Sequence, residues 1–286
     1  MTTATHRVDS HLHLWNLDVS EYAWLTPEHG ELHASFTPEH AQAELVAAGI
    51  DDAVLVQAED STADTAYLLE VAQQNDWVTG VVGWVQLDEP SVAEVQLETW
   101  MQYPEFVGVR HLIHADPRDG FLGIEGVRES LRLLAGNGVA LDVPDAWPRF
   151  LSDVTDVAAA IPELSIVLDH LGKPPRGTDQ LDAWREELAR LADHPNTVAK
   201  LSGLGIAGQP FTAEALDVVW TTALELFGAE RLMWGSDWPM TVPDGGYGAT
   251  AAVLDELVGT LSEHEQRAIY GDTANRVYKL WKFAKI

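Results

Sequence analysis

The 286-residue chain contains no cysteine. Disulfides, thiol catalysis and thiolate metal sites are therefore excluded, and any metal ion must be held by histidine and carboxylate side chains. The first ten residues lack the apolar stretch of a secretory signal, and no later segment approaches a membrane-spanning length. These absences predict a cytoplasmic protein that does not bind membranes.

Basic residues are also scarce. Lys and Arg total 17 against 45 Asp and Glu, which gives a formal net charge of −28 at pH 7. A field of this sign repels nucleic-acid phosphates and anionic lipids, so neither is expected as a partner. It also disfavours a highly anionic substrate, unless local cations such as Arg110 or Lys173 reverse the potential inside the site.

The chain is 46% hydrophobic, which is globular composition, and short β-rich runs alternate along it with segments of helical periodicity. Such alternation implies parallel pairing of the strands. The eight runs are Arg7–Leu12, Ala53–Ala58, Thr79–Leu87, Phe106–Leu112, Gly138–Val143, Leu164–His170, Thr197–Ser202 and Arg231–Asp237. We therefore expect residues 1–286 to form one α/β domain, a single (β/α)8 TIM barrel.

Helix signals support this interpretation. Thr37 followed by Pro38, and the capping box from Ser262 to Glu265, are typical of helix starts. An open doubly wound sheet is the structural alternative. It is disfavoured because the nearest approach to a dinucleotide fingerprint, Ser202–Gly208, lies too late in the chain to follow the first strand.

In a barrel, polar side chains at the carboxyl ends of strands face the catalytic mouth. His11 and His13 end the first run, and their spacing of two places both imidazoles on one side of an extended strand. His170 ends the sixth run and Asp237 the eighth, which neighbours the first once the barrel closes. Histidines, with or without a divalent metal, polarise a carbonyl, while a carboxylate accepts a proton from attacking water.

Several other residues are candidates for binding substrate. The guanidinium of Arg110 suits a carboxylate or hydroxyl, and the ammonium of Lys173 suits an oxyanion or a sugar hydroxyl, although either charge could instead be structural. His111 and Gln57 follow strands four and two. Further candidates are Trp15 and Trp84, whose indole faces suit the C–H faces of sugars, as well as His114 and Asp142.

A long segment, Asn16–Phe36, separates the first strand from the first clear helix. Loops of this length are often lids or binding elements, and aromatic residues in this one, Tyr22 and Trp24 among them, could cover a substrate. A packed surface loop is the alternative.

The motifs VDSHLHLW (Val8–Trp15), VLDHLGKP (Val167–Pro174) and RLMWGSDWP (Arg231–Pro239) resemble signatures of the amidohydrolase superfamily, in particular its sugar-lactonase branch of TIM-barrel hydrolases. The likeness covers the chain nearly end to end. That branch includes enzymes similar to L-fucono- and L-rhamnono-lactonases, and relatives that act on carboxylated lactones such as pyrone dicarboxylate and muconolactone derivatives.

The resemblance implies hydrolysis of a cyclic ester. It suggests His11, His13 and His170 as metal ligands or carbonyl polarisers, and Asp237 as the base that activates water and completes the metal site. Some members of the branch use zinc or another divalent ion, such as manganese, and others work without metal, so the cofactor stays open. Strand four offers Arg110 instead of the lysine that bridges two ions in binuclear members, and Lys200 in strand seven is not placed for that role.

Other functions remain open at this point. A metal-dependent decarboxylase or hydratase could use the same residues, whereas a glycoside hydrolase would need two apposed carboxylates, and strands four and seven end without glutamate. A carbohydrate-binding barrel without turnover would not need a polariser and a base in one place. The sequence leaves the oligomeric state open, a homo-oligomer included.

Overall fold

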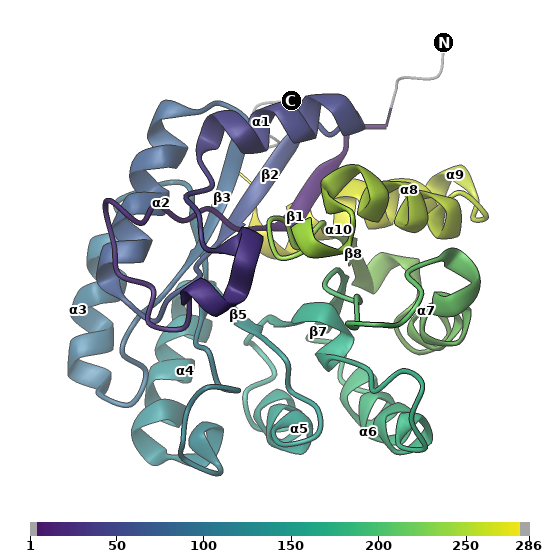
Figure 1. Cartoon of the computed structure of the whole chain (residues 1–286). Coiled ribbons are helices and arrows are strands. Elements are labelled where there is room, and N and C mark those ends of the chain that lie inside the picture. The colour runs from purple at the N-terminus through teal and green to yellow at the C-terminus, as the bar shows by residue number, and fades with distance from the viewer. Residues whose placement is uncertain (1–4, 281–286) are drawn as a thin grey trace.

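The computed structural model describes residues 5–280 of the chain. Eight parallel strands lie side by side in sequence order, and helices surround them (Figure 1). The strands are β1 (Val8–Leu12), β2 (Asp52–Val56), β3 (Val78–Gly83), β4 (Phe106–Arg110), β5 (Ala140–Val143), β6 (Ile166–Leu168), β7 (Thr197–Leu201) and β8 (Leu232–Trp234). The predicted (β/α)8 barrel is confirmed, and each strand overlaps its predicted run.

The barrel closes between β1 and the segment after β8. Leu12 and Trp238 form a parallel bridge, the His13 amide donates to the Trp238 carbonyl at 2.7 Å, and the Asp237 amide donates to the His11 carbonyl at 2.8 Å. These bonds bring the residues after β8 directly beside the histidine pair. The contacts that close the barrel therefore also bring the polar residues of β1 and of the segment after β8 together.

A buried carboxylate holds this seam. Oδ1 of Asp9 accepts hydrogen bonds from the backbone amides of His11 and Ser236 at 3.0 and 2.9 Å, and Oδ2 accepts one from the Tyr247 hydroxyl at 2.9 Å. Burial raises the pKa of Asp9 to about 6, although the bonds from Ser236, His11 and Tyr247 lower it. Asp9 thus links β1 to the turn after β8 that carries Asp237.

Helices follow the strands as expected for repeated βα units. They are α1 (Pro38–Ala48), α2 (Thr62–Gln74), α3 (Pro90–Trp100), α4 (Glu125–Asn137), α5 (Leu151–Ala160), α6 (Leu181–Ala192), α7 (Ala213–Phe227), α8 (Gly246–Val258), α9 (Glu263–Arg267) and α10 (Thr273–Tyr278). The predicted starts at Thr37-Pro38 and at Ser262 are confirmed, and Ser262 and Glu265 form the expected reciprocal capping box.

Apolar side chains form two main cores. The larger lies between the strands and the surrounding helices and includes fully buried residues such as Leu55, Leu131 and Trp184. The second gathers valines of the strands, for example Val54 and Val198, around Met233 and the C-terminal residues of the described chain. We call this second cluster the barrel floor, and its complete membership is Val8, Val54, Val56, Val82, Val107, Ala140, Val167, Val198, Met233, Ala274, Val277, Tyr278 and Leu280.

Six of the eight strands end before their predicted runs do, and β3, β6 and β8 are among them. The runs Thr79–Leu87, Leu164–His170 and Arg231–Asp237 overshoot β3, β6 and β8. His170 and Asp237 have positive φ angles of 56° and 57°, which a strand cannot accommodate. Both proposed site residues therefore lie on sharp turns just beyond strand ends, where their side chains turn towards the mouth.

None of the helices within residues 5–280 is both long and apolar enough to cross a membrane. Residues 1–4 belong to the segment used to predict the absence of a secretory signal, and they lie outside the described residues.

Candidate active site at the carboxyl end of the barrel

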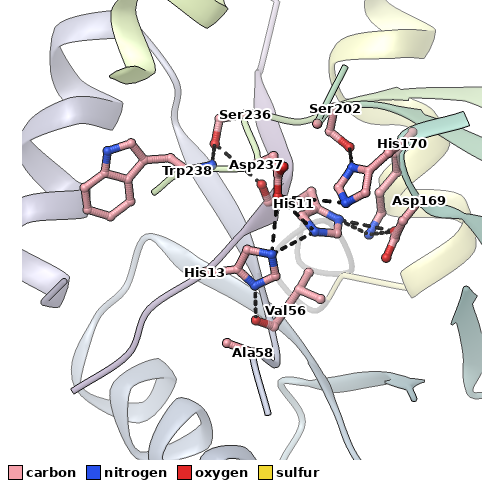
Figure 2. Close-up of polar contacts among 12 residues, drawn as sticks. His11, His13, Val56, Ala58, Asp169, His170, Ser202, Ser236, Asp237 and Trp238 are labelled. Carbon is pink, nitrogen blue, oxygen red and sulfur yellow. Dashed lines mark hydrogen bonds and ion pairs between the residues drawn. The ribbon is translucent and has the colours of Figure 1, made fainter. Parts of the chain in front are cut away.

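The histidine pair of β1 is buried at the mouth of the barrel. His11 and His13 are 0% and 4% exposed, and their Nε2 atoms lie 3.1 Å apart (Figure 2). Nδ1 of His13 lies 2.8 Å from the Val56 carbonyl, so this nitrogen carries the proton and Nε2 keeps its lone pair when the ring is neutral. The expected convergence of the two imidazoles is present.

Asp237 faces three imidazoles at once. Its Oδ1 lies 3.4 Å from Nε2 of His13, 3.7 Å from Nε2 of His11 and 3.9 Å from Nε2 of His170 (Figure 2). Burial alone would raise the pKa of Asp237. The electrostatic pull of His170, the hydrogen bond to His13 and the charges of the histidine pair outweigh that effect and hold the pKa well below its usual value. Asp237 is therefore an ionised, buried carboxylate.

His170 reaches the cluster from the turn after β6. Its Nδ1 lies 2.9 Å from the Ser202 hydroxyl, which fixes the ring so that Nε2 faces Asp237. The residue after Ser202, Gly203, has a φ of 56°, and a Cβ built there would lie 2.4 Å from His170 Nδ1 and 2.7 Å from Asp237 Oδ2. Only glycine leaves room for the backbone of this loop against the two side chains.

Burial also sets the charge state of the histidines. It lowers the pKa of His11 well below the ordinary value, against the opposing effect of Asp169, and it lowers the pKa of His170 despite the charge of Asp237. Burial thus favours the neutral form of both rings. Neutral imidazoles can donate a lone pair to a metal ion or a proton to a developing oxyanion.

A buried ionic network lies against the inner side of His11. Asp169 Oδ1 is 3.2 Å from Nδ1 of His11 and 3.0 Å from Nζ of Lys200, which is itself 2.5 Å from Asp142 Oδ2. Arg110 adds a contact of 3.3 Å to the second Asp169 oxygen. Asp169 holds the His11 ring in place and offsets the charges of two cations, and with His11 and His170 it forms a second group of side chains that could hold a metal ion.

The donor set fits one divalent ion. In their neutral forms His11 and His13 would turn two Nε2 lone pairs towards each other at 3.1 Å, next to the ionised Asp237. Such an arrangement is repulsive unless a cation lies close to the atoms, and in the structure the guanidinium of Arg110 lies with its Nη1 3.4 Å from His11 Nε2. His11, His13 and Asp237 offer ligand atoms within 4.8 Å of one another, and nitrogen and carboxylate donors are typical zinc ligands.

A pocket of about 200 Å³ opens above this cluster. Two of the catalytic candidates lining it, His170 and Asp237, come from the turns after β6 and β8. The complete lining is His13, Trp15, Trp24, Ala58, Arg110, Leu112, His114, Ala115, Pro144, Asp145, His170, Lys173, Asp237 and Met240. A ligand in this pocket would lie next to both the proposed base and two of the proposed polarisers.

Four of the predicted substrate contacts line the pocket, namely Arg110, Lys173, Trp15 and His114. Asp142, another candidate, does not line it and lies in the ionic network with Lys200. Arg110 donates to the Gln57 carbonyl and to Asp169, and Lys173 donates to the Gly203 carbonyl at 3.1 Å. The long loop also reaches the pocket, because Trp24 lines it and donates to the Ala58 carbonyl at 2.8 Å.

Three further predicted contacts, His111, Trp84 and Gln57, are also not among the described residues that line the pocket. His111 lies between Asp60 and Asp116 at 3.0 and 3.2 Å, and the Trp84 indole lies 3.2 Å from its Nδ1. Gln57 donates to Asp60 at 3.0 Å. These side chains hold the loops after β2 and β4 together.

Sequence reasoning did not assign Asp169, Lys200, Gly203 or Asp145 to the site. Lys200 interrupts the apolar run of β7, and an ionisable residue within a buried strand could have indicated a role in the site. Asp169 directly precedes His170, so its position could have indicated the same. Gly203 lies within the glycine-rich stretch that was weighed only as a dinucleotide fingerprint. Asp145 carried no signal that distinguished it from a turn residue.

A (β/α)8 barrel with two histidines from its first strand, one histidine after its sixth and an aspartate after its eighth defines a class of enzymes that polarise a carbonyl and activate water. The amidohydrolase family model matches residues 8–280. The chain belongs to the amidohydrolase family.

Similar proteins extend over almost the whole chain. Two proteins named L-fucono-1,5-lactonase, from Burkholderia ambifaria and Burkholderia multivorans, are 30% and 32% identical to it, and each alignment covers 96% of both chains. A crystal structure of an amidohydrolase from Burkholderia multivorans with bound zinc is 30% identical, with a TM-score of 0.87 over 96% of this chain and 99% of that one.

Proposed function

We propose that this protein is a lactonase that opens a cyclic ester of the sugar-lactone type by hydrolysis. The observation that carries the proposal is the buried carboxylate of Asp237 beside three buried imidazoles at a pocket of small-molecule size. The relatives named L-fucono-1,5-lactonase support this substrate class, because they match the chain end to end.

Asp237 acts as the general base. Its low pKa keeps it ionised throughout the neutral range, and it lines the pocket, so a water molecule between it and the substrate carbonyl can transfer a proton to it. As the water oxygen bonds to the carbonyl carbon, the carbonyl oxygen gains negative charge. The ring C–O bond then breaks, and the proton held on Asp237 passes to the departing alkoxide.

We assign stabilisation of the developing oxyanion to His11, His13 and His170. Nε2 of His170 can donate a hydrogen bond to it, whereas His11 and His13, whose Nε2 atoms carry lone pairs, would act through a divalent ion that they hold. Their positions are fixed before substrate binds, because Asp169, the Val56 carbonyl and Ser202 orient the three rings. Preorganised groups of this kind lower the cost of reorganising the site in the transition state. A divalent ion held by His11, His13, His170 and Asp237 would supply Lewis-acid polarisation of the same carbonyl oxygen.

Arg110, Lys173 and Trp15 complete the proposed substrate site. Lys173 brings an ammonium to the pocket on the turn after β6, and Trp15 contributes an indole next to that of Trp24. The product carries one carboxylate more than the substrate. The net charge of −28 favours release of such an anion. We also propose a cytoplasmic location, which cell fractionation would test.

A pH-indicator assay tests the function directly, because lactone opening releases a proton whereas decarboxylation consumes one. With L-fucono-1,5-lactone as the probe and zinc either supplied or removed by chelation, the wild-type protein should acidify the solution catalytically. Asp237→Asn should lower kcat by about 10²–10⁴-fold, the usual contribution of a positioned general base, with little change in KM.

Asp18→Asn, a matched change in the exposed part of the loop after β1, is the control and should leave kcat unchanged. The lactonase proposal fails if wild-type protein opens no hydroxylated lactone in either metal condition. The role given to Asp237 fails if its asparagine variant turns over at the wild-type rate.

A further inference from the structure

Asp145 is a pocket residue that the reaction described above does not use. It follows β5 by two residues and lines the pocket together with His114 and Lys173. Its φ of 44° lies in the left-handed region, which aspartate tolerates better than most non-glycine residues. Unusual backbone conformations of this kind are often retained where a side chain must be held at a functional site.

One carboxylate oxygen of Asp145 is unsatisfied. Oδ1 is buried and accepts no hydrogen bond from any described residue. Buried side-chain oxygens are usually hydrogen-bonded, because an unpaired acceptor loses its water contacts without replacing them. An unpaired acceptor at a ligand pocket is therefore ready for a donor that arrives with the ligand.

The positively charged side chains of the pocket, unlike Oδ1 of Asp145, make hydrogen bonds with other described residues of the chain. Arg110 already contacts Asp169 at 3.3 Å and donates to the Gln57 carbonyl, and Lys173 donates to the Gly203 carbonyl at 3.1 Å. Burial lowers the pKa of His114, although Asp145 opposes the shift, so this ring is neutral near pH 7. The pocket thus offers a carboxylate oxygen with no partner among the described residues, beside cations that each have at least one partner in the chain, although Arg110 Nε has none among those residues.

We propose that Asp145 determines the substrate class of the lactone site. Its free carboxylate oxygen accepts a hydrogen bond from a ring hydroxyl of a neutral, polyhydroxylated lactone and repels lactones that carry a carboxylate of their own. This inference rests on the proposed lactonase function and narrows it. Buried groups built to bond a substrate hydroxyl discriminate strongly against analogues that lack it, because the protein group is then left unpaired.

The test compares Asp145→Gly and Asp145→Asn with the wild type on three lactones. Glycine removes the carboxylate and accepts the positive φ without strain, and asparagine retains one acceptor oxygen without the charge. The lactones are L-fucono-1,5-lactone, the unsubstituted δ-valerolactone and the dianionic 2-pyrone-4,6-dicarboxylate. Thermal unfolding of each variant reports any purely structural effect.

For the hydroxylated lactone, Asp145→Gly should raise KM about 10- to 100-fold, because the hydrogen bond to the ring hydroxyl is lost, and kcat should stay within a few-fold of the wild type. A change of this size corresponds to about 1.4–2.8 kcal/mol of binding free energy. KM for δ-valerolactone should not change. Asp145→Asn should have a smaller effect on the hydroxylated lactone and should strengthen inhibition by the dicarboxylate, because the repelling charge is gone.

The outcomes separate this inference from the function on which it rests. Wild-type protein that opens no lactone would overturn the lactonase proposal itself. Wild-type protein that opens lactones, with equal KM changes for δ-valerolactone and the hydroxylated lactone in Asp145→Gly, would overturn only the role of Asp145. Wild-type preference for the dicarboxylate would also overturn that role.

Discussion

The two ends of the barrel interior are built from opposite chemistry. The barrel floor consists of strand valines, Met233 and the C-terminal Tyr278 and Leu280, and its one prominent hydroxyl, that of Tyr278, donates to Asp142 at 2.7 Å. The mouth holds ionisable side chains, positive φ angles at His170 and Asp237, and buried oxygens that accept no hydrogen bond from the described residues.

Because of this difference, a single strand can contribute one residue to the stability of the floor and another to the active site. In β7, for example, Val198 belongs to the floor, whereas Lys200 two residues later joins the ionic network beside His11. Apolar burial at the floor contributes stability in rough proportion to area. The strained and partly unpaired groups at the mouth, in contrast, cost stability and serve the chemistry of the site. Substitutions at the mouth and in the floor can therefore test the comparison separately.

The largest expected effect is at Gly203. A Cβ there would lie 2.4 Å from His170 Nδ1 and 2.7 Å from Asp237 Oδ2, so Gly203→Ala must displace both side chains. We expect kcat/KM to fall by about 10³-fold, since misplacing reacting groups by about 1 Å can cost 10²-fold and two groups move here. Steady-state lactone hydrolysis measures this effect.

Gly208→Ala provides the matched control. Gly208 has a similar positive φ of 76°, but nothing lies within 4 Å of a Cβ built there. The backbone strain is thus comparable and should lower the free energy of unfolding by about 1–2 kcal/mol in each variant, with a further loss in Gly203→Ala because its Cβ also displaces two side chains. Equal activity losses in the two variants would mean that strain, and not displacement of the site, explains the effect.

A substitution in the floor should show the reverse pattern. Met233 is fully buried, and Met233→Ala should lower the free energy of unfolding by about 2–5 kcal/mol while kcat of the folded protein stays unchanged. Met240→Ala, at the pocket, is the counterpart, because Met240 is 37% exposed and should cost under about 0.5 kcal/mol. Urea denaturation measures the difference in stability between the two variants. A large fall in kcat for Met233→Ala would contradict the separation of a stabilising floor from a functional mouth.

The smallest effect is a pH dependence at the β1–β8 seam. The pKa of Asp9 is raised from 3.8 to about 6 in the fold, so its contribution to stability is fully present below pH 3.8 and is lost as the pH rises through 6. Asp9→Asn cannot ionise. Between pH 4.5 and 7.5 its stability should therefore rise by about 2 kcal/mol relative to the wild type, because a tenfold change in an ionisation constant corresponds to about 1.4 kcal/mol.

Urea denaturation at the two pH values measures this difference. The same pH dependence in both proteins would show that Asp9 does not ionise within this range.

The fold and the central cluster were predictable from particular residues. Apolar runs such as the one around Val54 predicted parallel strands, and the positions of His11, His13, His170 and Asp237 at strand ends predicted that the four would meet. Strand periodicity and barrel closure are properties of the whole topology. They do not depend on the detailed path of any loop.

The rest depended on loops and on contacts distant in sequence. His111 was predicted at the substrate because it follows β4, but the pairing of its loop with Asp60 and Asp116 draws it elsewhere. Asp145 and Gly203 reach the site through positive φ angles, which no pattern of apolar residues reports. Loop conformation is set by such local turns and by packing between loops.

The central claim is that His170 and Asp237 act as one unit at the mouth, and a double-mutant cycle on lactone hydrolysis tests it most directly. His170→Asn and Asp237→Asn should each lower kcat by about 10²–10⁴-fold. The double variant should be no more than a few-fold worse than the poorer single variant, because groups that act together are strongly non-additive. Losses that multiply would show that the two residues work independently and would contradict this account.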